Sequence, residues 1–303
     1  MLGRLADLVE RDRDTLAEIK ALNEGKAISG CKAVDIDGAV DLLGYMAGWA
    51  TKIEGATKSV SIPGEHFAYT LKEPIGVIGA VVPWNWPFNM AIWKLAAPLA
   101  VGCTVVLKPA QVTPLSMLYF ARLCGEAGLP PGVVNIVLGR GADVGEALVS
   151  HSGVDKVSFT GSTPVGINVG LSATRNINPV TLELGGKSPM LVFDDAEIEA
   201  VVDATQQSVF FNTGQVCSAG SRLYVHKAIH SEVVNAIVNR ARQMKVGHVL
   251  LDETEMGPAI SKSQRDSVNA YIELGISEGA VMICGGENHE TPGYWLTPTV
   301  LDN

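Results

Sequence analysis

The sequence predicts an α/β fold in which helices cover a parallel sheet, and three observations favour it. Short runs of β-branched residues alternate with helical stretches from Ile75 onward. The same alternation resumes beyond Glu183. Of the 303 residues, 47% are apolar, which suffices for a large buried core.

The elements follow from hydrophobic spacing. Apolar residues recur at near-helical spacing between Leu5 and Leu22 and indicate an amphipathic surface helix. Alternation around Pro63-Gly64 indicates a hairpin over residues 59–71. The strands expected next are 77–82, 104–107, 133–137 and 157–159, and the helices are 89–101, 114–127, 144–150 and 163–174. Strands 189–193, 223–225 and 281–284 and helices 198–211, 229–244 and 262–278 then form a second α/β unit. Because no Pro- or Ser-rich linker divides the units, we place the boundary near Gly185 and expect tight packing.

Composition excludes several classes of function. The chain has 23 Lys and Arg against 32 Asp and Glu, a net charge of −9 that argues against nucleic acid. The apolar run from Leu95 to Leu107 contains Pro98 and Gly102 and falls short of the roughly 20 residues that a membrane span needs. The N-terminus lacks a secretory core, and the five cysteines form no Cys-x-x-Cys pair, so we expect free thiols in a reducing cytoplasm.

The segment from Phe211 to Arg222 places Cys217 in a small, polar, glycine-flanked loop between a helix and a strand. An approachable thiol can act as a nucleophile once it is a thiolate. The alternative is that Cys217 packs as a small hydrophobic residue, as most cysteines do.

Glu183 ends a β-rich run and precedes Gly185-Gly186, which allow another group to approach closely. Paired with a thiol site, this carboxylate is a candidate general base. The alternative is a salt bridge to Lys187 or a solvated strand end.

Three further segments indicate a ligand at the sheet edge. Residues 157–166 predict a strand, a glycine turn and a helix capped by Ser162 or Thr163. The start of such a helix can bind a phosphate, and the alternative is a purely structural turn. Asn85 lies between two tryptophans and could donate to an oxyanion or cap a turn. Lys108 ends a strand and could reach a ribose or remain a surface charge. His226 and His230 have no third ligand nearby, so we predict no metal.

Together these segments resemble the NAD(P)-dependent aldehyde dehydrogenase superfamily. The motifs, in the family's order, are Pro83-Trp84-Asn85, Lys108-Pro109-Ala110, Phe159-Thr160-Gly161-Ser162, Glu183-Leu184-Gly185-Gly186-Lys187 and Gly214-Gln215-Val216-Cys217. The resemblance implies a Rossmann-like cofactor domain over residues 1–184, including an oligomerisation hairpin near 59–71. It also implies an α/β catalytic domain over 185–303.

The resemblance further implies the role of each site residue. Cys217 attacks the aldehyde, and the Asn85 amide and the Cys217 backbone N–H hold the oxyanion of the thiohemiacetal. After hydride transfer to the nicotinamide, Glu183 activates the water that hydrolyses the thioester, and Lys94 assists proton movement.

Cofactor residues follow by the same resemblance. Lys108 and Gln111 hold the adenosine ribose, and Trp84 and Ser162 hold the pyrophosphate. Gly161 and Gly166 allow the backbone to approach the cofactor closely. Many NAD-preferring relatives carry glutamate where this chain has Gln111. The cofactor is therefore NAD or NADP, with the choice open.

The chain is shorter than the family's. It ends before the Glu-x-Phe-Gly-Pro segment and the C-terminal strand that pairs with a neighbouring subunit. We therefore expect an incomplete catalytic domain, a weakened homo-oligomer, and poor aldehyde oxidation by this chain alone. A non-catalytic relative with a nucleotide-binding or structural role stays an alternative, and a cysteine hydrolase would need a histidine beside Cys217. The substrate is open, because the tunnel residues implied by the resemblance are apolar or small: Trp86, Met90, Trp93, Val216 and Ser218.

Overall fold

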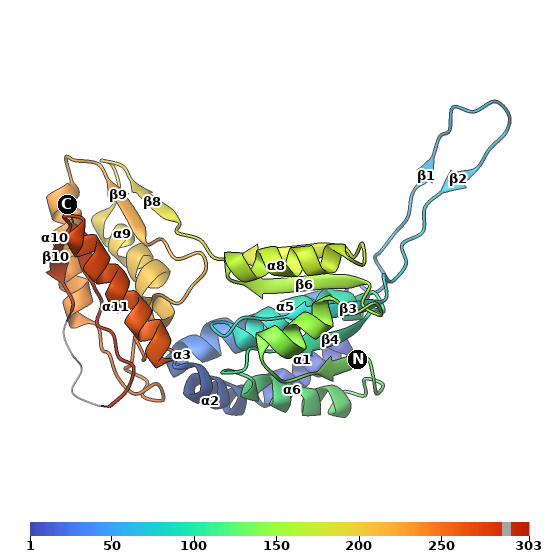
Figure 1. Cartoon of the computed structure of the whole chain (residues 1–303), viewed down its shortest axis with the longest axis horizontal. Coiled ribbons are helices and arrows are strands. Elements are labelled where there is room, and N and C mark those ends of the chain that lie inside the picture. The colour runs from blue at the N-terminus through green and yellow to red at the C-terminus, as the bar shows by residue number, and fades with distance from the viewer. Residues whose placement is uncertain (287–291, 303) are drawn as a thin grey trace. The chain divides into compact units, whose positions relative to one another are not determined.

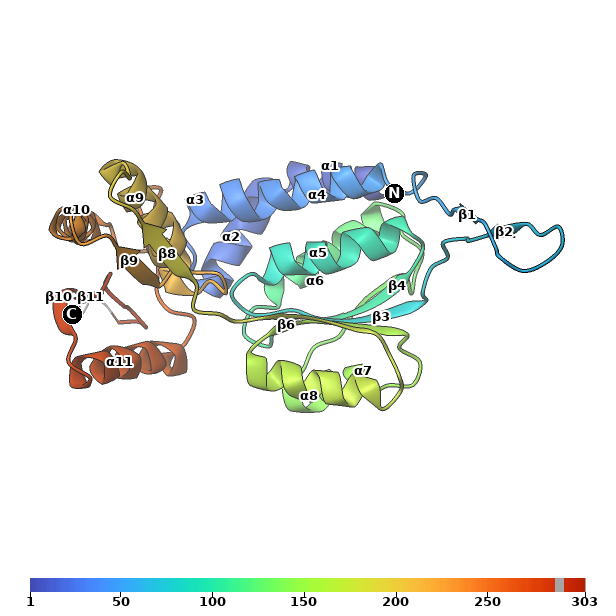
Figure 2. The same cartoon turned by 90° about the horizontal axis from the view of Figure 1, so that it is seen from above.

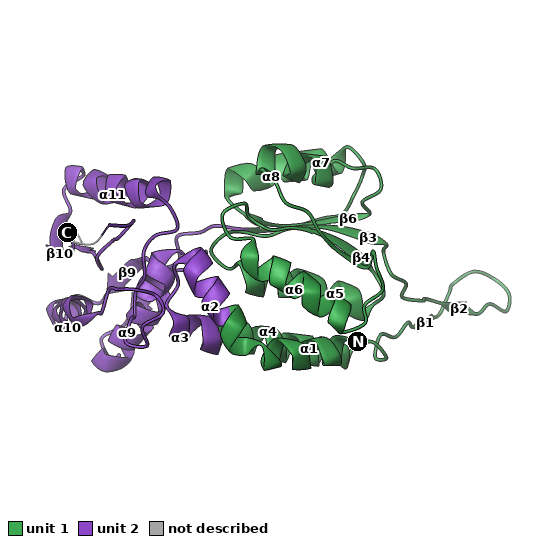
Figure 3. Ribbon diagram, turned by 90° about the horizontal axis from the view of Figure 1, so that it is seen from below, with its two compact units in different colours: residues 1–16, 34–183 green, residues 17–33, 184–303 purple. Residues whose placement is uncertain are grey.

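The computed structural model describes residues 1–286 and 292–302. Two compact units make up the chain: residues 1–16 with 34–183, and residues 17–33 with 184–303 (Figure 3). The domain roles assigned to residues 1–184 and 185–303 stay predictions. In the part of the chain that the structure describes, no helix combines the length and apolar content needed to cross a bilayer.

A five-stranded sheet forms the centre of the first unit, in the order β5-β4-β3-β6-β7. Strand β3 pairs in parallel with both β4 and β6, and β4 pairs in parallel with β5. The strand bounds are β3 Val77–Val81, β4 Thr104–Lys108, β5 Val134–Ile136, β6 Lys156–Gly161 and β7 Val180–Leu184. The predicted α/β fold with a parallel sheet is confirmed.

Helices cover both faces of this sheet (Figure 2). Helices α5 and α6 lie on one face, with α1 and α4 behind them, and α7 and α8 lie on the other. Because β3 and β4 are covered on both sides, they are nearly continuous apolar runs rather than alternating ones. The bounds are α1 Leu2–Arg11, α4 Asp37–Ala47, α5 Pro87–Ala100, α6 Leu115–Glu126, α7 Glu146–Val149 and α8 Thr163–Thr174.

The strand order contains a topological switch point. From β3 the chain moves outward through β4 to β5, and it then returns to place β6 on the other side of β3. Loops that leave neighbouring strands in opposite directions open a crevice at the carboxyl ends of those strands, where α/β proteins bind ligands. The segments after β3, β4 and β6 are those in which the sequence predicts ligand contacts.

The N-terminal helix corrects one expectation. The periodicity from Leu5 to Leu22 predicts a single surface helix, but the structure has α1 ending at Arg11 and α2 spanning Arg13–Glu24. Leu5 and Val9 are fully buried, so α1 is a core helix on one side.

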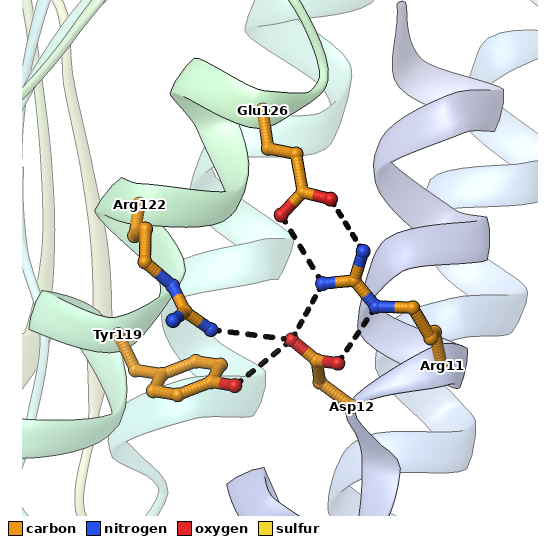
Figure 4. A network of polar contacts seen from close by, with 5 residues as sticks. All are labelled: Arg11, Asp12, Tyr119, Arg122 and Glu126. Carbon is orange, nitrogen blue, oxygen red and sulfur yellow. Dashed lines mark hydrogen bonds and ion pairs between the residues drawn. The ribbon is translucent and has the colours of Figure 1, made fainter.

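The break at Asp12 coincides with a polar network between α1 and α6 (Figure 4). The Asp12 carboxylate accepts hydrogen bonds from Arg11, from the Tyr119 hydroxyl at 2.9 Å and from Arg122 at 3.4 Å. Arg11 also donates to Glu126 at 3.1 Å. The hydrogen bond from Arg11 lowers the pKa of Asp12 to about 2. An aspartate with such partners favours a helix end over a helix interior.

The described residues of the second unit form two small sheets. Strand β8 (Pro189–Val192) pairs in parallel with β9 (Arg222–Val225), and β10 (Val281–Cys284) pairs antiparallel with β11 (Val300–Asp302). Its core includes Val192, Val202, Phe210, Val233 and Ile237. Its α-helices include α3 Ile28–Gly30, α9 Ile198–Thr205, α10 His230–Gln243 and α11 Lys262–Ser277, and π-helical segments span Cys31–Ile36 and, in the first unit, Gly141–Gly145.

The helix predicted over 198–211 is too long. The regular α-helix ends at Thr205 and continues as a π-helical turn over Gln206–Phe210 and a 3-10 turn over Phe211–Gly214. The apolar pattern continues through these residues, but the backbone is wider and then tighter than an α-helix. These irregular turns set the direction in which the chain enters the following loop, which carries Cys217.

A hairpin is present in the first unit, and its first strand begins two residues before the predicted range 59–71. Strand β1 (Thr57–Lys58) pairs antiparallel with β2 (Ala68–Tyr69), with Thr57 opposite Tyr69. The hairpin extends away from the sheet of its unit (Figure 1). It carries large exposed apolar side chains, with Phe67 78% and Leu71 70% exposed.

Candidate active site

Cys217 is the predicted nucleophile, and it lies in the second unit between the 3-10 turn Phe211–Gly214 and strand β9. All five cysteines lie in described residues, none of them forms a disulfide, and only Cys217 is exposed. Burial raises the pKa of the Cys124 thiol to about 12, so that thiol is inert at neutral pH. Exposure therefore singles out Cys217 as the approachable thiol.

The backbone just before Cys217 is strained. Asn212 and Thr213 have φ angles of 50° and 58°, in the left-handed region, and Gly214 has φ 70°. Asparagine and glycine tolerate this region, whereas a β-branched residue such as threonine is an outlier there, at a cost on the order of 1–3 kcal/mol. Strain of this size persists only where neighbouring contacts fix the conformation.

Those contacts come from a second segment of the same unit. The Thr213 hydroxyl donates to the Gly257 carbonyl at 2.9 Å, and the Ile260 N–H donates to Gln215 Oε1 at 3.0 Å. The Gln215 amide donates back to the Asn212 carbonyl at 3.0 Å. These hydrogen bonds fix the buried residues Asn212, Thr213 and Gln215 at the start of the loop, whereas Cys217 two residues later is exposed.

In the first unit, Lys94 and Glu183 line one cavity of about 430 Å³ beside helix α5 and strands β6 and β7. Lys94 Nζ donates to the Ser158 hydroxyl at 2.9 Å. Burial lowers the pKa of Lys94 to about 8, and the Glu183 carboxylate opposes this shift. The cavity therefore pairs an amine that titrates near neutral pH with an exposed carboxylate.

The depressed pKa of Lys94 makes stability depend on pH. Between its folded pKa of about 8 and its ordinary value of 10.5, the unfolded chain binds more protons, so stability rises with pH in that window. Below it, both states are protonated and burying the charge costs about 3 kcal/mol, from about 1.4 kcal/mol per pKa unit.

We therefore expect the free energy of unfolding of the wild type, relative to Lys94→Met, to rise by up to about 3 kcal/mol from about pH 7.5 to about pH 10.5. Urea unfolding of both proteins across this range measures the difference, in which other titrating groups cancel. If the free energies of unfolding of the two proteins changed with pH in parallel, Lys94 would not be desolvated as the structure indicates.

The other predicted residues lie along the carboxyl ends of the strands. Trp84 and Asn85 follow β3 and are half-buried. Lys108 ends β4, is buried, and donates to the Pro109 carbonyl at 3.0 Å, while Gln111 is exposed three residues later. Burial lowers the pKa of Lys108.

Ser162 is the N-cap of α8, and its hydroxyl makes no capping hydrogen bond. The helix N–H groups thus keep the anion-binding character expected of a helix start. A Cβ on Gly161 would lie 2.5 Å from the Phe159 ring, so a side chain there would force this buried ring to move. Gly166 is buried in the first turns of the same helix.

Sequence reasoning missed Ser158 and Thr160 as side chains of the cavity. The Thr160 hydroxyl is buried and has no hydrogen-bond partner among the residues that the structure describes. A signal was present, because the two polar residues alternate along β6 with the apolar Val157 and Phe159. Residues two apart share a face of a strand.

Comparison with known proteins adds to this geometry. The chain is 49% identical to retinal dehydrogenase 2 of Gallus gallus over 304 residues, which cover 100% of this chain and 58% of that protein. It is 47% identical to an aldehyde dehydrogenase of Bacillus cereus in its NAD+ complex, with a TM-score of 0.95, covering 99% of this chain and 61% of the other.

A betaine aldehyde dehydrogenase of Staphylococcus aureus in complex with NAD+ is 37% identical, with a TM-score of 0.95, and the match covers 99% of this chain and 60% of the other. This chain therefore spans about 60% of the length of the proteins that it resembles. The family model described as "Aldehyde dehydrogenase family" matches residues 1–303. The chain belongs to the aldehyde dehydrogenase family.

Proposed function

We propose that this chain carries the cysteine, the base and the cofactor-binding residues of an enzyme that oxidises aldehydes to carboxylic acids with NAD(P). The observation that supports it best is the exposed Cys217 on a strained, hydrogen-bonded loop, in a chain of the aldehyde dehydrogenase family. Water, the aldehyde and the oxidised cofactor yield the acid, the reduced cofactor and a proton.

In the first half of the reaction, the Cys217 thiolate forms a bond to the carbonyl carbon and gives a thiohemiacetal. The Asn85 amide and the Cys217 backbone N–H donate to its oxyanion, which stabilises the developing charge. A bound nicotinamide would supply the hydride acceptor for the thiohemiacetal carbon, whose oxidation would give a thioester on Cys217.

In the second half, Glu183 accepts a proton from water, and the resulting oxygen nucleophile releases the acid and restores the thiol. Lys94 lies in the same cavity as Glu183 and has a pKa lowered to about 8, so it can exchange protons with this site near neutral pH. This supports the predicted assistance to proton movement.

The residues present suit a dinucleotide. The uncapped start of α8 at Ser162 offers N–H groups to a pyrophosphate, and Gly161 and Gly166 keep side chains away from it. The Thr160 hydroxyl lies in the cavity beside Lys94 and has no hydrogen-bond partner within the described residues, so it can form a hydrogen bond with a polar ligand group. Trp84 is proposed to contact the pyrophosphate, and Lys108 and Gln111 the adenosine ribose.

Gln111→Glu tests the cofactor preference. Gln111 is exposed after β4, and a glutamate there would repel the 2′-phosphate of NADP. We expect NADP to be disfavoured relative to NAD by about 5- to 10-fold, since two charges about 4 Å apart in water interact by about 1 kcal/mol. The ratio of kcat/KM values for the two cofactors measures this effect, which should weaken with salt.

The control is Gln243→Glu, which adds the same charge at the exposed end of α10. If the ratio of kcat/KM values is unchanged in Gln111→Glu, residue 111 does not face the ribose.

Two further assignments belong to this proposal. Residues 1–184 form the cofactor-binding domain and 185–303 part of the catalytic domain. The β1–β2 hairpin associates with another copy of the chain, which is supported by the exposed apolar side chains Phe67 and Leu71. A cytoplasmic location stays a prediction.

The test of the proposal is an assay of cofactor absorbance with an aldehyde panel. The panel should pair NAD and NADP with a long apolar aldehyde and a cationic one, because Trp93 is exposed and lines the cavity with Met90. The two aldehydes probe apolar and cation–π contacts with these side chains. Aldehyde-dependent reduction of either cofactor supports oxidation, whereas cofactor binding without turnover favours the non-catalytic alternative.

A further inference from the structure

The second unit buries an ion cluster that the proposed reaction does not use. Lys20, Glu24 and Lys26 are each only 1% exposed. Lys20 Nζ forms an ion pair with Glu24, and Lys26 Nζ lies 3.5 Å from the other oxygen of the same carboxylate. Because charges removed from water must be compensated by their neighbours, a cluster of this kind holds its partners in a fixed arrangement.

The Glu24 carboxylate also reaches the strained turn before Cys217. Asn212 Nδ2 donates to Glu24 Oε1 at 3.2 Å and also lies within 3.4 Å of the Gln215 carbonyl. Next to it, the Phe211 ring packs against Lys26, whose Nζ is 5.4 Å from the ring centroid. The ion cluster and the left-handed turn are therefore one contiguous structure.

The geometry points to Glu24 and Asn212 as positioning residues: the buried Glu24 carboxylate, held by two lysines, binds the Asn212 amide and fixes the left-handed turn that presents Cys217. This inference rests on the proposed role of Cys217 as the nucleophile. Backbone strain that is maintained by a buried, charge-assisted hydrogen bond is a recurring way of orienting a reactive group.

Two variants remove the link from either side. In Asn212→Gly the new residue also tolerates positive φ, and only the side-chain amide is lost. The hydrogen bond from the turn to Glu24 is then absent. Glu24→Gln removes the charge from the centre of the cluster. The matched control for charge is Glu18→Gln, on the exposed side of the same helix. The matched control for a lost amide is Asn178→Gly, since Asn178 donates to the Val154 carbonyl at 2.7 Å, away from Cys217 in sequence.

The measurements separate positioning from stability. For Asn212→Gly at a temperature well below its thermal midpoint, we expect kcat to fall by about tenfold or more with the aldehyde KM within about twofold, because misplaced reacting atoms slow chemistry more than binding. The rate at which iodoacetamide alkylates Cys217, followed by peptide mass spectrometry, should change by about threefold or more. Asn178→Gly and Glu18→Gln should change neither quantity.

The Asn212→Gly variant provides the deciding comparison. If Asn212→Gly folds and matches the wild type in both kcat and Cys217 alkylation, the link is merely structural and the inference is overturned. If Glu24→Gln does not fold, Asn212→Gly still decides. If the wild type oxidises no aldehyde, the proposed function fails on its own. In that case the alkylation rate of Cys217 alone tests the positioning: a difference between wild type and Asn212→Gly supports it, and equal rates overturn it.

Discussion

Cys217→Ser is expected to abolish aldehyde oxidation, with a loss on the order of 10⁴-fold or more in kcat. A serine hydroxyl is a far weaker nucleophile than a thiolate unless a base is paired with it. Cys217 lies on a loop fixed by hydrogen bonds to residues 257–260, so a side chain that differs by one atom leaves the loop intact. Cofactor binding, measured by fluorescence titration, should stay nearly unchanged.

Cys284→Ser is the control for this experiment. Cys284 is half-buried in β10, where its thiol donates to the Pro298 carbonyl at 3.7 Å, and serine can make a similar contact. We expect this variant to retain turnover. Normal turnover by Cys217→Ser would exclude the thioester mechanism.

Glu183→Gln is expected to reduce steady-state turnover by about 10²- to 10⁴-fold, the usual contribution of a general base. The amide cannot accept a proton from water, but Cys217 can still be acylated. Hydrolysis should therefore become the slow step, and an acyl group should accumulate on Cys217. The measurement is the mass of the protein and of its Cys217 peptide after one turnover with a saturating aldehyde.

The matched control is Glu73→Gln, because Glu73 is an exposed carboxylate of the same unit that does not line the cavity. It should turn over normally and hold no adduct. A Glu183→Gln protein that slows without trapping an acyl group would assign Glu183 to acylation, or to the structure of β7, rather than to hydrolysis.

Much of the fold follows from local patterns. Helix α8 has the predicted bounds, residues 163–174, because Ser162, Pro164 and the preceding glycine are start signals within a few residues of one another. The sheet order could not be read from the sequence, since strand periodicity does not say which strand pairs with which. The break at Asp12 was missed for a related reason, because its partners Tyr119 and Arg122 lie more than 100 residues away.

Five short motifs are enough to identify the family, and the small polar residues and glycines around Cys217 predict an open loop. The surroundings of those residues depend on the three-dimensional fold. The fold brings Ser158 within hydrogen-bond distance of Lys94 in the cavity wall, and it brings Glu24 next to Asn212, 188 positions away in the chain. A motif reports the chemistry of neighbouring residues, whereas burial and hydrogen bonding depend on which distant segments the fold brings together.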